Sequence, residues 1–239
     1  MSGRSQPLTI TAPSEIIEWF ESTRVCTQLH IPFEIVFERS ELLPEFDIGQ
    51  FSVSLIKLSH RVDSTAYSFK ERWPTCNLDT KKLADAGIPS GSLWGQIAKG
   101  NDIEYEGKSI LASDYVIAAK SKKIVIAGDN DTPELLLEAC QECDVLVHES
   151  TYTVDIIESS GNSYGHSYAQ KVAEFAESVA LPNLVLTHFS ARYQFDESQS
   201  PSIADIREEA KCHYTGNLYL SEDFNHYRLD KSGTLKLLS

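Results

Sequence analysis

The sequence predicts an α/β fold in which parallel strands present polar side chains at one edge of a sheet. Three apolar stretches in the second half of the chain predict strands, and they end on Asp129, on His148 with Glu149, and on His188. Segments with helical periodicity separate these stretches. Because helical crossovers bring the carboxyl ends of parallel strands to the same edge, we expect these side chains to lie close together.

The first hundred residues predict a β-rich layer, which gives the α/β fold an α+β character. PLTI and FEIVFE predict short strands, and Ser14 between them predicts the cap of a helix. In FSVSLIKLSH, Phe51, Val53 and Leu55 alternate with serines before the chain reaches His60. This alternation is typical of a half-buried strand, so His60 is expected just after a strand end.

Helix-start signals follow the predicted strands of the second half. Thr132 and Pro133 predict a helix that begins about one turn after the strand KIVI, which places Asp129 in the connecting turn. Ser167 and Gln170 fit a capping box, so His166 is expected just outside a helix start. Ser200-Pro201 predicts a third helix start, IEYEGKSI a hairpin, and NLYLSEDFNHYRL a last strand.

Short motifs follow one another in an order that is itself informative. They are QPLTITAP near Gln6, KLSHRVDSTAYSF around His60, GIPSGSLW at Gly87, GDN at Gly128, HEST at His148, GHS at Gly165 and THFSARY at Thr187. This ordered set resembles ribonuclease Z, the metallo-β-lactamase-fold endonuclease that trims tRNA 3′ ends. The resemblance covers nearly the whole chain and implies one metallo-β-lactamase-like αββα sandwich over residues 1–239.

One motif of that family does not occur in the sequence. The family's H-x-H-x-D-H motif supplies several zinc ligands and the acid–base aspartate, but none of the seven histidines here belongs to an H-x-H pair. In the family this motif lies just before the segment that starts here at Met1. We therefore expect an N-terminally truncated fold: either the chain begins at an internal methionine, or it is a shortened form with impaired activity.

The resemblance also implies roles for individual residues. His60 and His188 match zinc ligands, one for each of two ions, and Asp129 matches the carboxylate that bridges the ions. His166 matches the catalytic histidine, and Glu149 is expected to orient it by a hydrogen bond. Three protein ligands shared by two ions would leave each ion poorly coordinated. Without the resemblance, a histidine after an apolar strand is more often a structural residue.

Roles are also expected for other residues near these positions. Ser190 and Arg192, just past His188, are candidates for contacts with substrate phosphate. His148 is expected to bond a neighbouring backbone carbonyl. Asn130 stands where the family usually has threonine, and this departure is expected to alter hydrogen bonding to the bridging carboxylate.

The net charge of −14 argues against an RNA partner, but the charges are unevenly distributed. Residues 129–158 hold nine acidic and no basic residues, which predicts either a solvated face or a surface that attracts cations near a metal centre. Residues 70–100 hold an excess of lysine and arginine and several turn-forming prolines and glycines. In ribonuclease Z an arm at this place grips the tRNA body, which implies that role for Lys81, Lys82 and Lys99, with Trp94 packing the arm. The alternative is a mobile surface loop.

Composition agrees with one soluble domain, because 239 residues with 41% hydrophobic content can bury a sizeable core. No apolar run suits a membrane helix or a signal core, so a cytoplasmic protein is expected. Five cysteines favour reduced thiols, and the pair Cys140 and Cys143 is expected to pack in the interior.

The predicted function is a zinc-dependent endoribonuclease that processes the 3′ end of precursor tRNA. The resemblance implies a homodimer, since the family's arm reaches across to the substrate of the partner. Two alternatives stay open: a related hydrolase of small phosphodiesters or other esters, and a non-catalytic remnant that binds RNA or pairs with an intact subunit. The arm-like insertion argues against a small substrate, which needs no remote grip.

Overall fold

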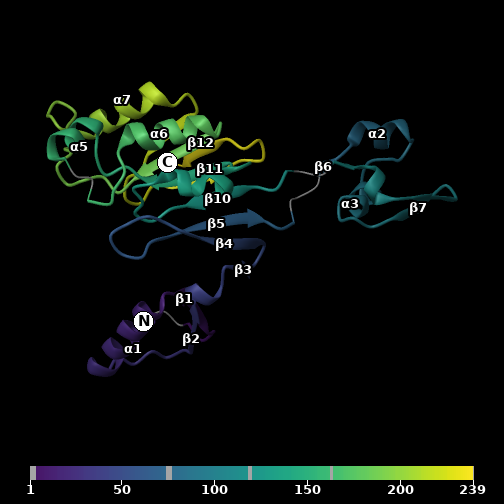
Figure 1. Cartoon of the computed structure of the whole chain (residues 1–239). Coiled ribbons are helices and arrows are strands. Elements are labelled where there is room, and N and C mark those ends of the chain that lie inside the picture. Colours follow the sequence, from purple (N-terminus) through teal and green to yellow (C-terminus); the bar gives the residue numbers. More distant parts are fainter. Residues whose placement is uncertain (1–3, 74–76, 118–119, 162–163, 239) are drawn as a thin grey trace. The chain divides into compact units, whose positions relative to one another are not determined.

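The computed structural model, drawn in Figure 1, describes residues 4–73, 77–117, 120–161 and 164–238. The chain divides into two compact units, each with a hydrophobic cluster of its own. Unit 1 comprises Met1–Phe69 and Lys123–Ser239, and unit 2 comprises Lys70–Lys122.

Unit 1 is built on a mixed sheet, to which seven strands contribute among the described residues. These strands are β3 (Glu45–Ile48), β4 (Phe51–Lys57), β5 (Thr65–Glu71), β10 (Lys123–Ile126), β11 (Val145–Glu149), β12 (Asn183–Thr187) and β13 (Asn217–Leu220). They lie in the order β13-β12-β11-β10-β5-β4-β3. Strands β10 to β13 are parallel, whereas β3 and β4 are antiparallel. The three strands predicted to share one edge therefore do so.

Helices connect the parallel strands, as the sequence predicts. They are η3 (Pro133–Leu136) and α4 (Leu137–Cys140) after β10, α5 (Val154–Ser160) and α6 (Ala169–Ser178) after β11, and α7 (Ile203–His213) after β12. Figure 1 shows α6 and α7 over the same side of the sheet. These helices bury the apolar residues that the strands direct toward that side.

Each face of the sheet has its own apolar partner. Leu184 and Leu186 of β12 belong to the cluster formed with α6 and α7, whereas Val185 belongs to a cluster on the other side. That second cluster includes Leu235 of the antiparallel hairpin β14 (His226–Leu229) and β15 (Leu235–Leu238). The single last strand predicted for NLYLSEDFNHYRL is therefore wrong, because a turn separates β13 from β14.

The capping box predicted for Ser167 and Gln170 is also wrong. The hydroxyl of Ser167 donates to the carbonyl of Asn130 at 2.7 Å, so it does not cap α6. The helix start predicted at Thr132 and Pro133 is present as the start of η3, although the hydroxyl of Thr132 donates to the side chain of Asp131 and makes no capping bond. The third helix starts two residues later than Ser200-Pro201 predicts, since Ser202 forms a capping box with Asp205. The predicted interior packing of Cys140 and Cys143 is confirmed.

The amino-terminal part of unit 1 contains β1 (Leu8–Ala12), α1 (Ser14–Cys26), β2 (Ile35–Arg39) and η1 (Ser40–Leu42). β1 and β2 pair in parallel, and both were predicted. Ser14 does not cap α1, because its hydroxyl donates to Glu41. Helix α1 has no buried residue, and Ile16 and Trp19 are more than half exposed. Within the described residues, no helix combines the length and the apolar character needed to cross a membrane.

Unit 2 is longer than the insertion predicted at residues 70–100. Its elements are β6 (Asn77–Leu78), α2 (Thr80–Asp85), α3 (Ser92–Ile97), β7 (Ile103–Tyr105), β8 (Lys108–Ile110), η2 (Ala112–Asp114) and β9 (Val116–Ile117). The predicted hairpin is present as β7 and β8. Trp94 packs against the cluster of Leu83 and Ile97, and its indole N–H donates to the carbonyl of Ile88 at 2.9 Å. The segment therefore has a buried cluster of its own.

Glu209 of α7 joins the starts of two other helices. Its carboxylate accepts the backbone N–H of Val154 in α5, with a shortest distance of 2.9 Å, and that of Gln170 in α6 at 2.8 Å. These N–H groups have no partner within their own helices, so an acceptor from elsewhere is needed. Glu209 is half-buried, and this burial raises the pKa of its carboxyl.

We expect Glu209→Gln to destabilise the protein by about 1–2 kcal/mol, because one amide oxygen replaces two carboxylate oxygens. Urea unfolding followed by circular dichroism measures the change. Glu208→Gln is the matched control: its exposed side chain makes only an ion pair with Lys211, so we expect a loss below about 0.5 kcal/mol. Equal losses for the two variants would contradict the capping role of Glu209.

Candidate metal centre

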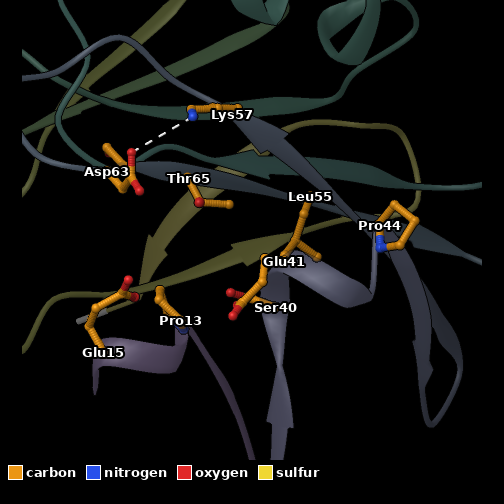
Figure 2. A pocket seen from close by; sticks show the side chains of 10 residues that line it. Pro13, Glu15, Ser40, Glu41, Pro44, Leu55, Lys57, Asp63 and Thr65 are labelled. Carbon is orange, nitrogen blue, oxygen red and sulfur yellow. Dashed lines mark ion pairs between the residues drawn. The ribbon is translucent and has the colours of Figure 1, made fainter. Parts of the chain in front are cut away.

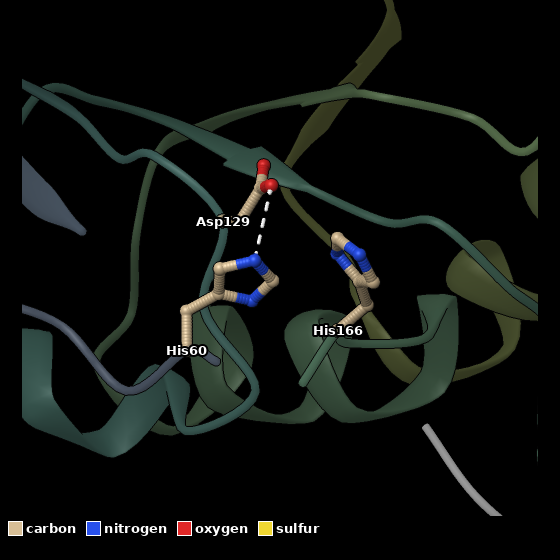
Figure 3. Close-up of side chains that lie close together, drawn as sticks. All are labelled: His60, Asp129 and His166. Atoms are coloured by element: carbon tan, nitrogen blue, oxygen red, sulfur yellow. Dashed lines mark ion pairs between the residues drawn. The ribbon is translucent and has the colours of Figure 1, made fainter. Parts of the chain in front are cut away.

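Four side chains that the sequence singles out lie together beyond the carboxyl ends of the strands. His60 follows β4, Asp129 follows β10, His188 follows β12, and His166 precedes α6. Nε2 of His60 lies 3.6 Å from Oδ2 of Asp129, and Nε2 of His188 lies 3.6 Å from Oδ1. Figure 3 shows His60, Asp129 and His166 close together. The ring of His166 is centred 4.8 Å from that of His60 and 5.2 Å from that of His188.

The spacing of these atoms fits metal coordination. Each carboxylate oxygen of Asp129 faces a different imidazole, which is the arrangement of a carboxylate shared by two ions. Two ligand atoms of a tetrahedral zinc ion, each at about 2.1 Å from the metal, are roughly 3.4 Å apart. The observed 3.6 Å between each nitrogen and its facing oxygen is close to that value.

The hydrogen bonds of the two imidazoles leave Nε2 free to act as a ligand. Nδ1 of His60 lies 2.7 Å from the carbonyl oxygen of Gly165, which only accepts, so Nδ1 carries the proton. Nδ1 of His188 lies 2.9 Å from the hydroxyl of Thr151. Because that hydroxyl donates to Glu149 at 2.6 Å, it accepts from Nδ1 of His188. Fixing the tautomer in this way is common around metal-binding histidines.

A buried carboxylate holds the fourth side chain. Glu149 is 1% exposed, and its Oε1 lies 3.3 Å from Nδ1 of His166. The same oxygen accepts the backbone N–H groups of Ser167 at 2.9 Å and Asn130 at 3.1 Å. Its Oε2 accepts both the hydroxyl and the N–H of Thr151. The carboxylate thus has several donors in place of water, and His166 is fixed on one side.

The side chain of Asn130 bonds neighbours other than the carboxylate of Asp129. Its side-chain oxygen accepts the N–H groups of Ser59 and Thr132, each at 3.2 Å, and its amide donates to Nε2 of His148 at 3.0 Å. The fully buried Asn130 therefore ties the turn that precedes His60 to the end of β10.

His148 bonds a backbone carbonyl, as expected. Its Nδ1 donates to the carbonyl of Glu149 at 2.7 Å, while Nε2 accepts from Asn130. Burial lowers the pKa of His148, which agrees with a neutral ring that uses one nitrogen as donor and the other as acceptor. His148 therefore supports the centre indirectly, through its hydrogen bond with Asn130.

The acidic stretch 129–158 is not a uniformly solvated face. Asp144 and Glu149 are almost fully buried, and Asp144 accepts the backbone N–H of Lys123 at 2.9 Å. Asp129 is one third exposed and faces the two histidines. Position in the fold, and not the local count of charges, decides what each carboxylate does.

The proposed substrate contacts lie in two places. Ser190 and Arg192 follow His188, and the Arg192 Nε donates to the Ser190 hydroxyl while its guanidinium lies 5.1 Å from the ring centre of Tyr152. Lys81, Lys82 and Lys99 belong to unit 2, where all three are exposed. The ammonium of Lys82 donates to the carbonyl of Asp114 at 2.7 Å, so this lysine also has a structural partner.

A separate hollow of about 450 Å³ lies elsewhere in unit 1 and is shown in Figure 2. Its lining includes Pro13 before α1, Ser40 of η1 and Leu55 of β4, and an ion pair of 3.8 Å joins Lys57 to Asp63 at its wall. None of the side chains that the sequence predicts as functional lines this hollow. The candidate metal ligands therefore lie in the histidine cluster and not in this hollow.

Comparisons with known proteins agree with this geometry. No family model matches the chain. Ribonuclease Z of Pseudomonas putida (strain W619) is 44% identical over 236 residues, which cover 98% of this chain and 74% of that protein. The chain belongs to the ribonuclease Z family.

The metallo-β-lactamase fold protein YhfI of Bacillus subtilis matches with a TM-score of 0.54 and 16% identity, over 90% of this chain and 63% of that one. The human tRNase Z short form (ELAC1) also gives a TM-score of 0.54, with 22% identity, over 92% and 67%.

These likenesses confirm the fold class that the motifs predict, a mixed α/β metallo-β-lactamase fold. The chain spans about three quarters of the ribonuclease Z from Pseudomonas putida and less than two thirds of YhfI. Among the described residues, two groups have donor atoms close enough to hold a metal ion: His60 with Asp129 and His166, and Glu149 with His166 and His188.

Gly165 allows the close approach of His60. It has φ +82°, and a Cβ atom at this position would lie 2.9 Å from Nδ1 of His60, so alanine would displace the ring. We expect Gly165→Ala to weaken zinc affinity roughly tenfold or more, as the loss of a supporting contact does at other metal sites. Titration of the purified protein against a chromophoric zinc chelator measures this change.

Gly161→Ala is the matched control. Gly161 has a similar left-handed backbone with φ +67°, but a Cβ atom there meets nothing within 4 Å. Both variants should lose roughly 1–2 kcal/mol of stability from backbone strain. Only Gly165→Ala should also lose zinc affinity, and equal zinc affinities for the two variants would contradict the proposed support of His60.

Proposed function

We propose that this chain is a zinc-dependent endoribonuclease that processes the 3′ end of precursor tRNA by hydrolysis of a phosphodiester bond. The observation that carries the proposal is the convergence of His60, Asp129 and His188, with both Nε2 atoms free, beside His166. Membership in the ribonuclease Z family supports the choice of an RNA phosphodiester over other substrates of the same fold.

The proposed metal ligands divide the work between two ions. His60 would hold one ion and His188 the other, while Asp129 would contribute one carboxylate oxygen to each. When bound, zinc polarises a phosphodiester and lowers the pKa of a coordinated water, so that hydroxide attacks phosphorus near neutral pH. The protein holds each Nε2 in position through the bonds of Nδ1 to Gly165 and Thr151.

His166 is proposed to complete the reaction as the general acid. The Glu149 carboxylate holds Nδ1 of His166, which leaves Nε2 to give a proton to the leaving oxygen as the P–O bond breaks. The same imidazolium would stabilise the negative charge on the phosphorane. Glu149 acts through His166 as a positioning residue, and Ser190 and Arg192 are proposed to contact the substrate phosphate.

Variants of the histidines separate metal binding from catalysis. We expect His188→Ala to lose bound zinc and cleavage together, because it removes a ligand. His166→Ala should keep its zinc but lose roughly 10²- to 10⁴-fold in the rate of precursor tRNA cleavage, the range for general acid catalysis. Metal analysis by mass spectrometry and a gel assay of cleavage products measure the two properties.

The exposed His226, outside the cluster, provides the control for these variants. His226→Ala should keep both zinc and activity. If His166→Ala cleaved precursor tRNA as fast as the unchanged chain, the proposed proton donor would be wrong.

A second candidate is a non-catalytic chain that binds RNA or pairs with an intact subunit. It is favoured by the small number of ligands: each ion would receive two protein groups from the described residues, whereas catalytic zinc sites have three. Binding of precursor tRNA without zinc and without cleavage would support this candidate over the endonuclease. Cleavage of small phosphodiesters but not of tRNA would instead support the small-substrate hydrolase.

Unit 2 is proposed to grip the tRNA body away from the cut, through Lys81, Lys82 and Lys99. Support comes from charge: unit 2 holds eight basic and seven acidic residues, whereas the rest of the chain has a net charge of −15. Phosphate contacts dominate non-specific affinity for nucleic acids, so the least acidic part of the chain is the natural place for them. We further propose a homodimer, as the family resemblance implies.

Charge reversal tests the grip. Lys81→Glu with Lys99→Glu should weaken tRNA binding and reduce the slope of log affinity against log salt by about one for each lysine. Lys82 is left unchanged because it also bonds Asp114. A filter-binding salt titration measures both quantities. The double variant Lys57→Glu with Lys231→Glu makes the same change of charge in unit 1 and should leave the slope less affected; identical slopes would argue against the grip.

A further inference from the structure

A cavity beside His188 extends from Ser190 to residues that have no role in the chemistry proposed above. Its volume is about 800 Å³, within the roughly 300–1,000 Å³ that is usual for sites of small ligands. His188 and Ser190 form part of its wall, and Phe195, Asp223 and Phe224 form another part. A group bound in this cavity would therefore lie next to one of the proposed metal ligands.

Two aromatic side chains in this wall are unusually exposed. Phe224 is 96% exposed and Phe195 is 81% exposed, the two highest values among the large hydrophobic residues that the structure describes. Phe224 also has φ +67°, a left-handed conformation that is unfavourable for a side chain of this kind. Single exposed apolar residues are normal, but two aromatic rings at one cavity beside a candidate active site indicate a binding surface.

A smaller neighbouring cavity continues this surface. It has a volume of about 190 Å³ and shares Phe195 and Ile203 with the first cavity. Its lining adds two basic side chains, Arg207 and Lys211, which also form surface ion pairs with Glu197 and Glu208. Aromatic rings followed by basic side chains are typical of grooves for single-stranded nucleic acid, in which bases stack and phosphates meet positive charge.

At the part of the first cavity's wall formed by Glu222 and Asp223, the charges favour a base over a phosphate. The carboxylates of these two residues would repel a phosphate group. Carboxylates can instead accept hydrogen bonds from the amino groups of bases. The flat face of a base suits the exposed ring of Phe224, and its polar edge suits these acceptors.

We propose that this cavity takes an unpaired nucleobase of the RNA, next to the phosphate that is cut, stacked on Phe224 with Phe195 as a second apolar contact. The inference rests on the proposed function, because it assigns a subsite for the same substrate. Stacking on an aromatic side chain accepts any base, so this subsite would hold the strand in place without selecting a sequence.

Precursor tRNA that carries 2-aminopurine tests the subsite, because the fluorescence of this base falls when it stacks. Two RNAs place the probe on the 5′ side or the 3′ side of the cut, and the protein is the full chain. We expect quenching at one of the two positions. Phe224→Ala should abolish the quenching and weaken binding roughly 5- to 100-fold, and Phe224→Tyr should restore both.

Trp19→Ala is the control, because Trp19 is an exposed aromatic residue of α1 that does not line the cavity. It should leave quenching and affinity unchanged. Anisotropy of the same RNA separates the possible failures. Binding without quenching at either position, or quenching that survives Phe224→Ala, would overturn the subsite alone. No binding of precursor tRNA at all would overturn the proposed function together with it.

Discussion

The buried carboxylate of Glu149 is the interaction on which the candidate centre depends. It lies at the end of β11 and connects the turn after β10, the segment after β11 and the start of α6, through Asn130, Thr151 and Ser167. An unpaired charge at 1% exposure would cost several kcal/mol, so all of these donors must be in place for the centre to form. The same contacts fix His166 and, through Thr151, His188. Loss of activity in a Glu149 variant would therefore reflect structure as well as chemistry.

His188 shows how the fold concentrates strain at this edge. It has φ +58°, a left-handed conformation that is uncommon for histidine. Thr151 contacts both its carbonyl oxygen, at 3.0 Å, and its Nδ1. The strand that carries His188 is buried on both faces, so the backbone cannot relax by shifting the strand. Such strain persists when the surrounding structure enforces it, and it is most common at functional sites.

The strands, and the sheet edge at which the candidate metal centre lies, could be predicted from the sequence. Most of the hydrogen bonds that support the centre could not. Apolar runs such as NLVLT predict buried strands from local sequence alone. Parallel pairing of these strands then places His188 at the edge of the sheet. Caps are different, because Ser167 has the right sequence to cap α6 but its hydroxyl bonds Asn130, 37 residues away. Glu209 replaces it from another helix, 39 residues from Gln170. Contacts between polar residues so distant leave no periodic pattern in the sequence.

Thr151 is the functional residue that the sequence reasoning missed, although it belongs to the motif HEST. A polar residue just after a buried strand was the available signal, but only the three-dimensional arrangement reveals that its single hydroxyl proton serves Glu149 and leaves its oxygen to orient His188. The buried cluster of unit 2 likewise depends on contacts between distant residues, because Ile103 of β7 packs with Leu83 of α2.

Electrostatics then links the centre to RNA binding. Outside unit 2 the chain has a net charge of −15, which opposes the approach of a phosphate backbone. Some of these carboxylates are buried and hydrogen-bonded within the fold, as those of Asp144 and Glu149 are. The carboxylate of Asp129, in contrast, remains accessible at the candidate centre. Divalent cations held there would reverse the local charge at the place where the phosphate must enter. Because coupling between two ligands is reciprocal, cations that favour RNA binding must in turn be held more tightly when RNA is bound. An acidic chain with few metal ligands would thus hold its ions best in the presence of its substrate.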